Sequence, residues 1–597
     1  MDKFLTIKLT LSDYPGTADK FISRIDVSPL GASPGQGCVF TLPIILSGIT
    51  SFEAYFKTLI NEPKASQQLK ELGISLFKCI FQDGVRDKWN NILGLINYGQ
   101  SNKLRIAFNI LSEKLVNIPW ELLHDGNDHL LRIKRISIVR VIDELVAPKK
   151  AFGPITHPLL IVANPGGYFN ADEHIENIYN EFVQANILES NINVLKDATK
   201  DNIFEFLQQH RDGDFLYFLG HGGLDENEEG VILLQSDTNQ EGENLEAARL
   251  AEGLNDSNIR FVYFNSCSTG VSGSGTFSGV GQKIMLRGDV VSVIAMQAPI
   301  SAQKGMDIAK LFIRKIMQIE TIEVALSSVR NQYVADSFTW AIPIIYTYLQ
   351  GPEDFEKNQV LSLLGSLIRE ETYALCIPSF KETLLEEEIS SKGYKAQINV
   401  NGNDVNNSEY YHYPGLSFAQ SDIKAANYIT NLLLMVTSYD NIKLLKGSAI
   451  QEETASKCIF LFGSRSNVYV SQVLNGYSPT FRLYYNKKEW YIIDKGYNKK
   501  YSINPPDQQS SEQWDAIADY CCIQKIIATS KVYFLISGLG DRGTIGGCWW
   551  FIENWKFLLR EAGTGEFRYL LRLPTSIYSD IEIVTRENNE WGQSIDE

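Results

Sequence analysis

The chain has 597 residues, 44% of them hydrophobic, and a formal net charge of −16 at pH 7. This length predicts more than one domain, since single hydrophobic cores rarely grow beyond roughly 250–300 residues. The acidic balance argues against bulk binding to nucleic acid or anionic membranes, but it is compatible with a basic protein partner.

No apolar run reaches the roughly 18 residues that a membrane-spanning helix needs, and Met1 to Thr6 lack the apolar core of a signal peptide. The eight cysteines and seven histidines are scattered, without the spacing of zinc ligands. We therefore expect a reduced, cytoplasmic protein that has no structural disulfide, no metal site and no other cofactor.

Residues 1–150 carry the patterns of an α+β layer. Residues 4–11 alternate between apolar and polar side chains, as a half-buried strand does. Residues 51–97 have helical periodicity, and residues 104–111 again resemble a strand. We expect Trp120 to lie in the core where this layer packs on the following sheet, with Glu121 as a capping carboxylate.

Residues 151–352 alternate between buried-strand and helix patterns. Apolar runs bounded by turn residues predict strands at 159–163, 193–194, 215–219, 260–264, 290–296 and 340–348. Helical patterns fall between them at 172–184, 199–210, 245–254, 307–318 and 322–334. This order predicts an α/β fold with a mostly parallel sheet that is flanked by helices.

We place a linker at residues 353–370 and a second, C-terminal α/β domain at residues 371–597. Two turns in this domain, at 463–467 and 537–544, follow strands and carry an arginine each. Such turns can form an anion-binding cleft at the carboxyl edge of a sheet, or they can be ordinary βα turns. In the first case the ligand-binding residues are Ser464, Arg465, Asn467, Asp541, Arg542 and Thr544.

Two strand ends carry reactive side chains. The run 215–219 leads into Gly220-His221-Gly222, and the run 260–264 leads into Asn265-Ser266-Cys267. Reactive groups of α/β sheets gather at the carboxyl ends of the strands, where a histidine can take the thiol proton to give a nucleophilic thiolate. A single cysteine is usually a small buried hydrophobe, but the equivalent placement of His221 and Cys267 favours a catalytic pair.

The backbone N–H groups of Gly222 and Cys267 are expected to hold an oxyanion. The glycine- and serine-rich segment 270–281 is expected to be a substrate or activation loop. An acidic run such as 224–230 is usually a solvated turn. Residues considered for orienting the histidine or for contacting substrate are Asp214, Asn164, Asp225, Glu226 and Gln297.

The His221 and Cys267 motifs resemble those of the CHAT family of caspase-like cysteine peptidases, which are relatives of caspases and separase. Further segments over roughly residues 100–350 resemble the same family: Pro119–Leu123, Ile136–Arg140, Leu159–Pro165, Val290–Ile300 and Trp340–Pro343. Where such sequences often carry an acidic residue, this chain has Ser301-Ala302-Gln303, which weakens the implied preference for basic substrate residues.

The resemblance implies a cysteine endopeptidase that cleaves a partner protein through a His–Cys dyad, in a bacterial defence or cell-death pathway. The C-terminal domain would gate it in response to an activating ligand or a regulatory protein. Two alternatives remain: a non-catalytic scaffold with a caspase fold, and a C-terminal nucleotide-binding sensor as the main activity.

Overall fold

The structure is a computed structural model that divides into an N-terminal unit, residues 1–356, and a C-terminal unit, residues 357–597. The residues that it describes are 3–30, 37–43, 46, 56, 65–98, 102–133, 135–142, 150, 153–236, 242–266, 279–318, 320–333, 338–349, 351–365, 372–377, 398–400, 403–405, 410–413, 416–446, 453, 456, 458–463, 470, 473, 481–485, 490–495, 498–502, 518–528, 531–573 and 581–588.

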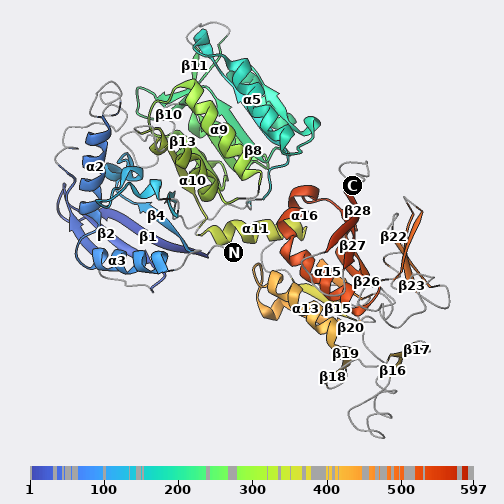
Figure 1. Ribbon diagram of the computed structural model, residues 1–597. Coiled ribbons are helices and arrows are strands. Elements are labelled where there is room, and N and C mark those ends of the chain that lie inside the picture. Colours follow the sequence, from blue (N-terminus) through green and yellow to red (C-terminus); the bar gives the residue numbers. More distant parts are fainter. Residues whose placement is uncertain are drawn as a thin grey trace. The chain divides into compact units, whose positions relative to one another are not determined.

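One sheet of 11 strands runs through the N-terminal unit, in the order β3-β2-β1-β4-β5-β14-β13-β12-β8-β6-β7 (Figure 1). Its strands are β1 (Lys3–Asp13), β2 (Phe21–Val27), β3 (Gly37–Phe40), β4 (Asn102–Ile110), β5 (Ile136–Val141), β6 (Pro158–Val162), β7 (Asn193–Leu195), β8 (Phe215–Leu219), β12 (Phe261–Asn265), β13 (Ser292–Met296) and β14 (Pro343–Thr347). Most neighbours are parallel, and the exceptions are β1 with β2, β2 with β3, and β13 with β14. The predicted α/β fold with a mostly parallel sheet is confirmed.

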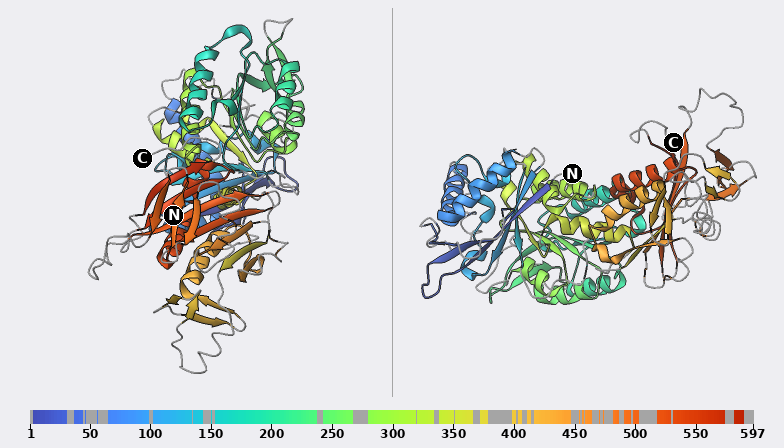
Figure 2. Two further views of the ribbon diagram at one scale, coloured as in Figure 1. Left: turned by 90° about the vertical axis from the view of Figure 1, so that its right-hand side faces the viewer. Right: turned by 90° about the horizontal axis from the view of Figure 1, so that it is seen from below.

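Helices cover both faces of this sheet (Figures 1 and 2). The helices α5 (Ala171–Gln184), α9 (Ala302–Ile316) and α10 (Ile322–Gln332) share one core with alternate strand residues. The intervening strand residues pack in a second core, against α6 (Lys200–Gln209), α7 (Ala247–Asn255) and α8 (Val280–Arg287). Successive strand residues point to opposite faces, so Tyr217 lies in the first core and Phe218 in the second.

The N-terminal strands belong to the same sheet. β5 pairs with β14, and β4 and β1 continue the sheet from there, while α2 (Ala65–Ile80) and α3 (Asp83–Tyr98) join the first core. The expectation that residues 1–150 form a layer packed against the sheet is therefore wrong. Backbone hydrogen bonding across the edge of β14 extends the sheet, which side-chain patterns alone do not reveal. Trp120 is fully buried, as predicted.

Shorter elements complete the unit. A separate three-stranded sheet, in the order β11-β10-β9, contains β9 (His221–Leu224), β10 (Gly230–Leu234) and β11 (Glu243–Glu246). The remaining short helices are α4 (Glu113–Val116), η2 (Trp120–Leu122), η3 (Leu130–Arg132), η4 (Pro165–Gly167), η5 (Glu189–Asn191) and η6 (Thr339–Ala341).

The C-terminal unit contains a seven-stranded sheet in the order β20-β15-β21-β26-β25-β27-β28. Its strands are β15 (Tyr373–Ile377), β20 (Ile442–Lys446), β21 (Cys458–Phe462), β25 (Asp519–Ile527), β26 (Val532–Gly538), β27 (Phe567–Leu573) and β28 (Glu582–Asn588). The helices α13 (Gln420–Leu433), α15 (Asp541–Glu553), α16 (Trp555–Ala562) and η7 (Tyr439–Asn441) accompany it. The second α/β region is thus confirmed.

Several smaller strands lie outside that sheet: β16 (Ile398–Val400), β17 (Asn403–Val405), β18 (Tyr410–Tyr413), β19 (Leu416–Ala419), β22 (Phe481–Tyr485), β23 (Trp490–Asp494) and β24 (Lys499–Ser502). The division between the two units, after Glu356, lies inside helix α11 (Pro352–Leu363), so the segment expected as a linker begins as a helix.

Candidate active site

His221 lies directly beyond the carboxyl end of β8, as the sequence predicts. Gly220 separates it from Leu219 and allows a tight turn, because a Cβ atom at Gly220 would lie 2.7 Å from the carbonyl oxygen of Ala163. His221 then opens β9, followed by Gly222, which faces Ile232 of β10.

Two aromatic rings pack on the half-buried imidazole of His221. The Tyr168 ring meets it edge to face, with centroids 5.4 Å apart, and the Phe169 ring lies at 5.8 Å. The Nε2 atom of His221 is buried and hydrogen-bonds to none of the described residues. Burial lowers the pKa of His221 below its ordinary value, so the ring is neutral at pH 7 and able to accept a proton.

Asn164 shapes the loop that carries these rings. Its side-chain Nδ2 donates to the carbonyl oxygen of Phe169 at 2.8 Å, and its Oδ1 accepts the backbone N–H of Tyr168 at 3.0 Å. Gly166 and Gly167 turn the loop with φ angles of 79° and 67°, which glycine adopts without strain. Asn164 therefore acts on His221 through Tyr168 and Phe169.

The strand that leads to the cysteine is β12, and it pairs with β8 in parallel. Asn265 is opposite Leu219, and the backbone N–H of Gly220 donates to the carbonyl oxygen of Asn265 at 3.4 Å. The same 46-residue offset separates His221 from Cys267 in the sequence. Cys267, and with it most of the predicted loop 270–281, lies outside the described residues; the description resumes at Gly279, ahead of α8.

A buried polar cluster, defined here as His174, Tyr217 and Asn265, lies beneath the strand ends. The Asn265 Nδ2 atom is 2.8 Å from the Tyr217 hydroxyl and 3.0 Å from His174 Nε2, and the hydroxyl is 2.8 Å from the same nitrogen. Sequence reasoning missed this cluster. The only local signal is that a tyrosine and an asparagine occupy inward-facing positions of two otherwise apolar strands.

Asp214 does not orient His221. It precedes β8, so the five residues of that strand separate it from the histidine end. Its carboxylate accepts hydrogen bonds from the backbone N–H groups of Thr156 and His157 and from the Thr156 hydroxyl, and it pairs with Arg260 at 3.3 Å. Asp214 stabilises the start of the strand instead.

The acidic turn between β9 and β10 is mostly an internally bonded turn. Asp225 Oδ1 accepts the backbone N–H groups of Asn227 and Glu229, each at 2.9 Å, while Glu226 is exposed. Glu229 forms an ion pair at 2.9 Å with Lys283 of α8, the helix that follows the cysteine segment. Asp225 is therefore occupied by its own turn, whereas Glu226 is free to meet solvent or substrate.

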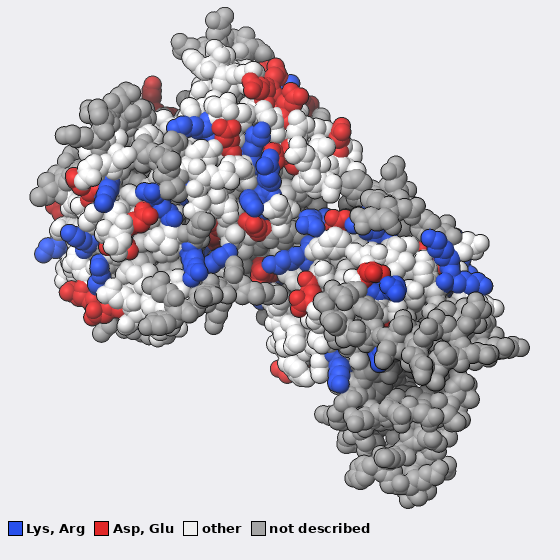
Figure 3. Space-filling model, viewed as in Figure 1, with Lys and Arg blue, Asp and Glu red and all other residues white. Residues whose placement is uncertain are grey.

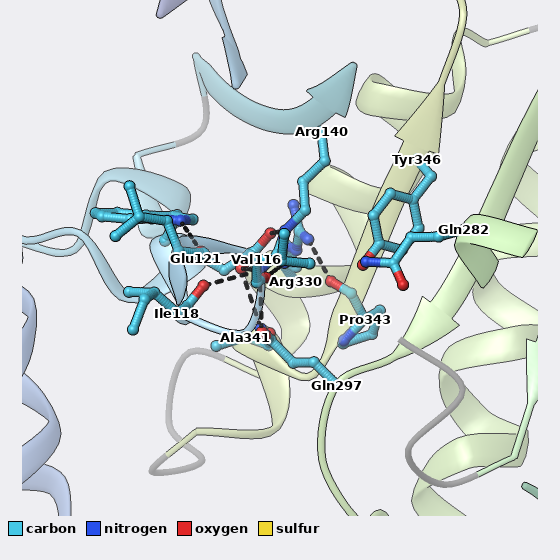
Figure 4. A network of polar contacts seen from close by, with 12 residues as sticks. Val116, Ile118, Glu121, Arg140, Gln282, Gln297, Arg330, Ala341, Pro343 and Tyr346 are labelled. Atoms are coloured by element: carbon cyan, nitrogen blue, oxygen red, sulfur yellow. Dashed lines mark hydrogen bonds and ion pairs between the residues drawn. The ribbon is translucent and has the colours of Figure 1, made fainter. Parts of the chain in front are cut away.

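Gln297 is buried in a polar network and does not face an open site (Figure 4). Its Nε2 donates to the carbonyl oxygen of Ala341 at 2.7 Å and to Glu121 at 3.2 Å, and its Oε1 accepts from Arg140 at 3.2 Å. The expected capping role of Glu121 is wrong, because its carboxylate is bound by Arg140 instead.

Gly279, the first described residue after Cys267, is held by buried side chains near this polar network. Gln282 accepts the backbone N–H of Gly279 at 3.1 Å and donates to the Tyr346 hydroxyl at 3.0 Å. The guanidinium of Arg140 lies 5.9 Å from the centre of the Tyr346 ring (Figure 4). The first described residue after the segment is thus tied to the core through buried side chains.

In the C-terminal unit, Ser464, Arg465 and Asn467 lie outside the described residues. In the second turn, several backbone donors between residues 538 and 544 have internal partners. Asp519 accepts the backbone N–H groups of Gly540 at 3.1 Å and Gly543 at 2.6 Å, and the Thr544 hydroxyl accepts that of Gly538. These contacts use the Thr544 hydroxyl oxygen, and Arg542 is exposed; anion binding by this turn stays a prediction.

Within the described ranges, no three His, Cys, Asp or Glu side chains are placed to hold a metal ion. The helices of those ranges include none that is long and apolar enough to cross a membrane. On the face drawn in Figure 3, basic and acidic side chains are interspersed, and no broad basic surface of the kind that attracts nucleic acid is seen there.

The sheet is mostly parallel, and a histidine follows the carboxyl end of β8. In the sequence, a cysteine follows β12, the neighbour of β8 in the sheet. These features are those of the class of caspase-like proteins. Residues 70–347 match the sequence model of the CHAT domain family. This part of the chain is a CHAT domain, as its motifs predict.

Comparison with solved structures gives matches of low identity and low TM-score. The Arg-specific cysteine proteinase gingipain R is 12% identical over 51% of this chain and 75% of its own, with a TM-score of 0.30. The separase of Saccharomyces cerevisiae, in complex with securin, is 14% identical over 41% of this chain but only 15% of its own, with a TM-score of 0.28. A secreted C11 cysteine protease from Bacteroides thetaiotaomicron is 13% identical over 45% of this chain and 89% of its own, with a TM-score of 0.23. No curated protein matches the chain.

Proposed function

We propose that the N-terminal unit is a cysteine endopeptidase with His221 as the base and Cys267 as the nucleophile. The observation that carries the proposal is the buried Nε2 atom of His221, to which no described residue hydrogen-bonds. It lies beyond the end of β8, the strand that pairs with β12, and β12 leads in the sequence to Cys267. A neutral imidazole at the end of a strand whose neighbour in the sheet leads to a cysteine in the sequence suits proton transfer from a thiol.

In this mechanism His221 takes the proton of the Cys267 thiol, and the thiolate attacks the carbonyl carbon of a peptide bond. The backbone N–H groups of Gly222 and Cys267 hold the resulting oxyanion. The imidazolium returns the proton to the leaving amine as the C–N bond breaks, and water then hydrolyses the thioester. The substrate is a partner protein.

The proposal has three finer parts. The scattered cysteines favour a cytoplasmic location, and the resemblance to CHAT peptidases implies a bacterial defence or cell-death pathway. The C-terminal unit gates the peptidase in response to a ligand or regulatory protein. The rival reading is a scaffold that keeps the fold without the reaction. For a scaffold, replacing Cys267 changes nothing that the protein does.

The test compares wild type, Cys267→Ala and His221→Ala on a mixed fluorogenic peptide panel and on proteins from the genomic neighbourhood. Cleavage by wild type alone establishes the peptidase, and the cleaved peptides identify the residue before the scissile bond. Alkylation of Cys267 by iodoacetamide, followed by peptide mass spectrometry, covers the case in which a trigger is missing. A Cys267 that reacts no faster in wild type than in His221→Ala, with or without candidate ligands, contradicts the dyad.

A further inference from the structure

Asn265 joins the two strands that lead to the proposed dyad. Its carbonyl oxygen accepts the backbone N–H of Gly220, which follows β8 and precedes His221. Its side chain donates to the hydroxyl of Tyr217 on β8. Asn265 itself stands two residues before Cys267. One residue therefore contacts the histidine strand twice while it belongs to the cysteine strand.

The cluster is closed over by helices. His174 of α5 supplies the third side chain, and Gly305 of α9 packs so closely that a Cβ atom there would lie 2.5 Å from the Asn265 Oδ1 atom. His174, Tyr217 and Asn265 are 3%, 0% and 5% exposed, respectively. The side-chain amide of Asn265 is thus enclosed by α5, which precedes it in the chain, and by α9, which follows it.

The protonation of His174 agrees with this arrangement. Burial lowers the pKa of His174 to about 4, so the ring is neutral and its Nε2 can accept from the Tyr217 hydroxyl and from the amide of Asn265. Mutually satisfied polar groups in a core are directional, whereas apolar side chains of the same volume would pack without fixing an orientation. An apolar residue at position 265 would hold the strands together but would not lock the strand ends to each other.

We propose that Asn265 is a positioning residue for the dyad. Its bonds to Tyr217, His174 and Gly220 hold the carboxyl ends of β12 and β8 in the register that brings Cys267 to His221. The inference rests on the proposed function, because it specifies how that pair is aligned. Asn265 touches neither substrate nor the reacting atoms.

The experiment measures the rate at which iodoacetamide alkylates Cys267 as a function of pH, in the full-length protein. Peptide mass spectrometry separates Cys267 from Cys79, which is partly exposed, and from the buried cysteines. The variants are Tyr217→Phe, which removes only the hydroxyl, Asn265→Ala, and the double variant. Ser292→Ala is the matched control. Its fully buried hydroxyl lies 2.7 Å from the Thr347 hydroxyl, at the first residue of β13 and therefore away from the carboxyl ends of the strands.

In wild type we expect His221 to extend rapid alkylation below the pH range of an ordinary thiol, whose pKa is about 8.5. Tyr217→Phe and Asn265→Ala should each lower the rate at pH 7 about tenfold and move the profile toward an ordinary thiol. Ser292→Ala should not, even where its melting temperature falls equally. Because both single changes remove the hydrogen bond between Asn265 and Tyr217, the double variant should be no slower than Asn265→Ala.

The outcomes separate the two proposals. If His221→Ala leaves the wild-type profile unchanged, the dyad is wrong, and the positioning role is overturned with it. If His221→Ala changes the profile while Tyr217→Phe and Asn265→Ala behave as Ser292→Ala does, the dyad stands and the positioning role alone is overturned.

Discussion

Arg140 and Glu121 form a bidentate ion pair inside the core of the N-terminal unit. The guanidinium Nε and Nη2 atoms of Arg140 donate to the two carboxylate oxygens of Glu121 at 3.0 and 2.7 Å, and the side chains are 3% and 1% exposed. The pair joins the short helix η2 to β5. Gln297 extends the contact to the end of β13. Three separate chain segments thus meet at one buried carboxylate (Figure 4).

Removing that carboxylate should be costly. Glu121→Gln leaves the buried charge of Arg140 without its counter-charge, and breaking such a pair typically costs about 3–5 kcal/mol. We expect a loss of that size in the free energy of unfolding, measured by urea denaturation. The control is Asp172→Asn, which breaks an exposed pair with Lys196 and should leave the free energy of unfolding nearly unchanged. Equal losses in the two variants would show that the buried pair is not a stabilising contact.

Tyr168 should control the protonation of His221. The tyrosine ring is itself 73% exposed, yet it packs nearly perpendicular to the imidazole, with the ring centroids 5.4 Å apart. Tyr168→Ala exposes His221 to water, and we expect the pKa of His221 to rise toward its ordinary value, as read from an NMR titration of the ring protons. Tyr439→Ala removes a tyrosine of the other unit that is 71% exposed, and it should leave this titration unchanged. A fixed pKa in Tyr168→Ala would mean that other groups desolvate the imidazole.

The N-terminal unit should lose stability in mild acid. Burial lowers the pKa of both His129 and His174 to about 4, whereas the unfolded chain titrates near 6.5. As the pH falls below 6.5, these histidines become protonated in the unfolded state but stay neutral in the folded state. The free energy of unfolding therefore declines until the pH reaches about 4. Between pH 7.5 and 5.5 we expect each histidine to account for a loss of about 1 kcal/mol. Urea denaturation at both pH values gives the total loss in the free energy of unfolding. In His174→Gln this total should be smaller by about 1 kcal/mol. An unaltered pH dependence would contradict the role of His174.

Asp519 should hold the turn of the C-terminal unit that follows β26. Asp519→Ala deprives the backbone N–H groups of Gly540 and Gly543 of a charged acceptor, and we expect a loss of about 3 kcal/mol in the stability of that unit. Asp440→Ala, at an exposed position of the same unit, is the control. Inorganic phosphate, compared with chloride at equal ionic strength, should not raise the melting temperature through this turn. A phosphate effect that disappears in Arg542→Ala would instead support an anion site at this turn.

The sequence was sufficient for the buried strands β6, β8, β12 and β13 and for the placement of His221. Runs such as 215–219 and 261–264 are apolar on both faces and end in glycine or small polar residues, a local pattern that the sheet obeys. The carboxyl end of such a strand is then a fixed place in the fold, so His221 could be located without knowing any of its contacts.

The polar contacts could not be predicted in this way, because their partners are far apart in the chain. Glu121 follows the pattern of a helix cap, but Arg140 competes for it from the next strand. Asp519 accepts hydrogen bonds from a turn that begins 19 residues later, and no residue of the turn indicates that a carboxylate binds there. The sequence shows Asn265 only as a neighbour of the cysteine, because its partners His174 and Tyr217 come from a helix and another strand.

The position of β14 has a consequence for how the protein is made. This strand lies between β5 and β13, although it is the last of the 11 strands to be synthesised. The strands made first can therefore join the rest of the sheet only after residue 347 has left the ribosome. Until then β5 and β13 each present an open edge, and unpaired edges invite association between chains. A fragment that begins near residue 150 keeps β14 but lacks β5, and would carry such an edge permanently.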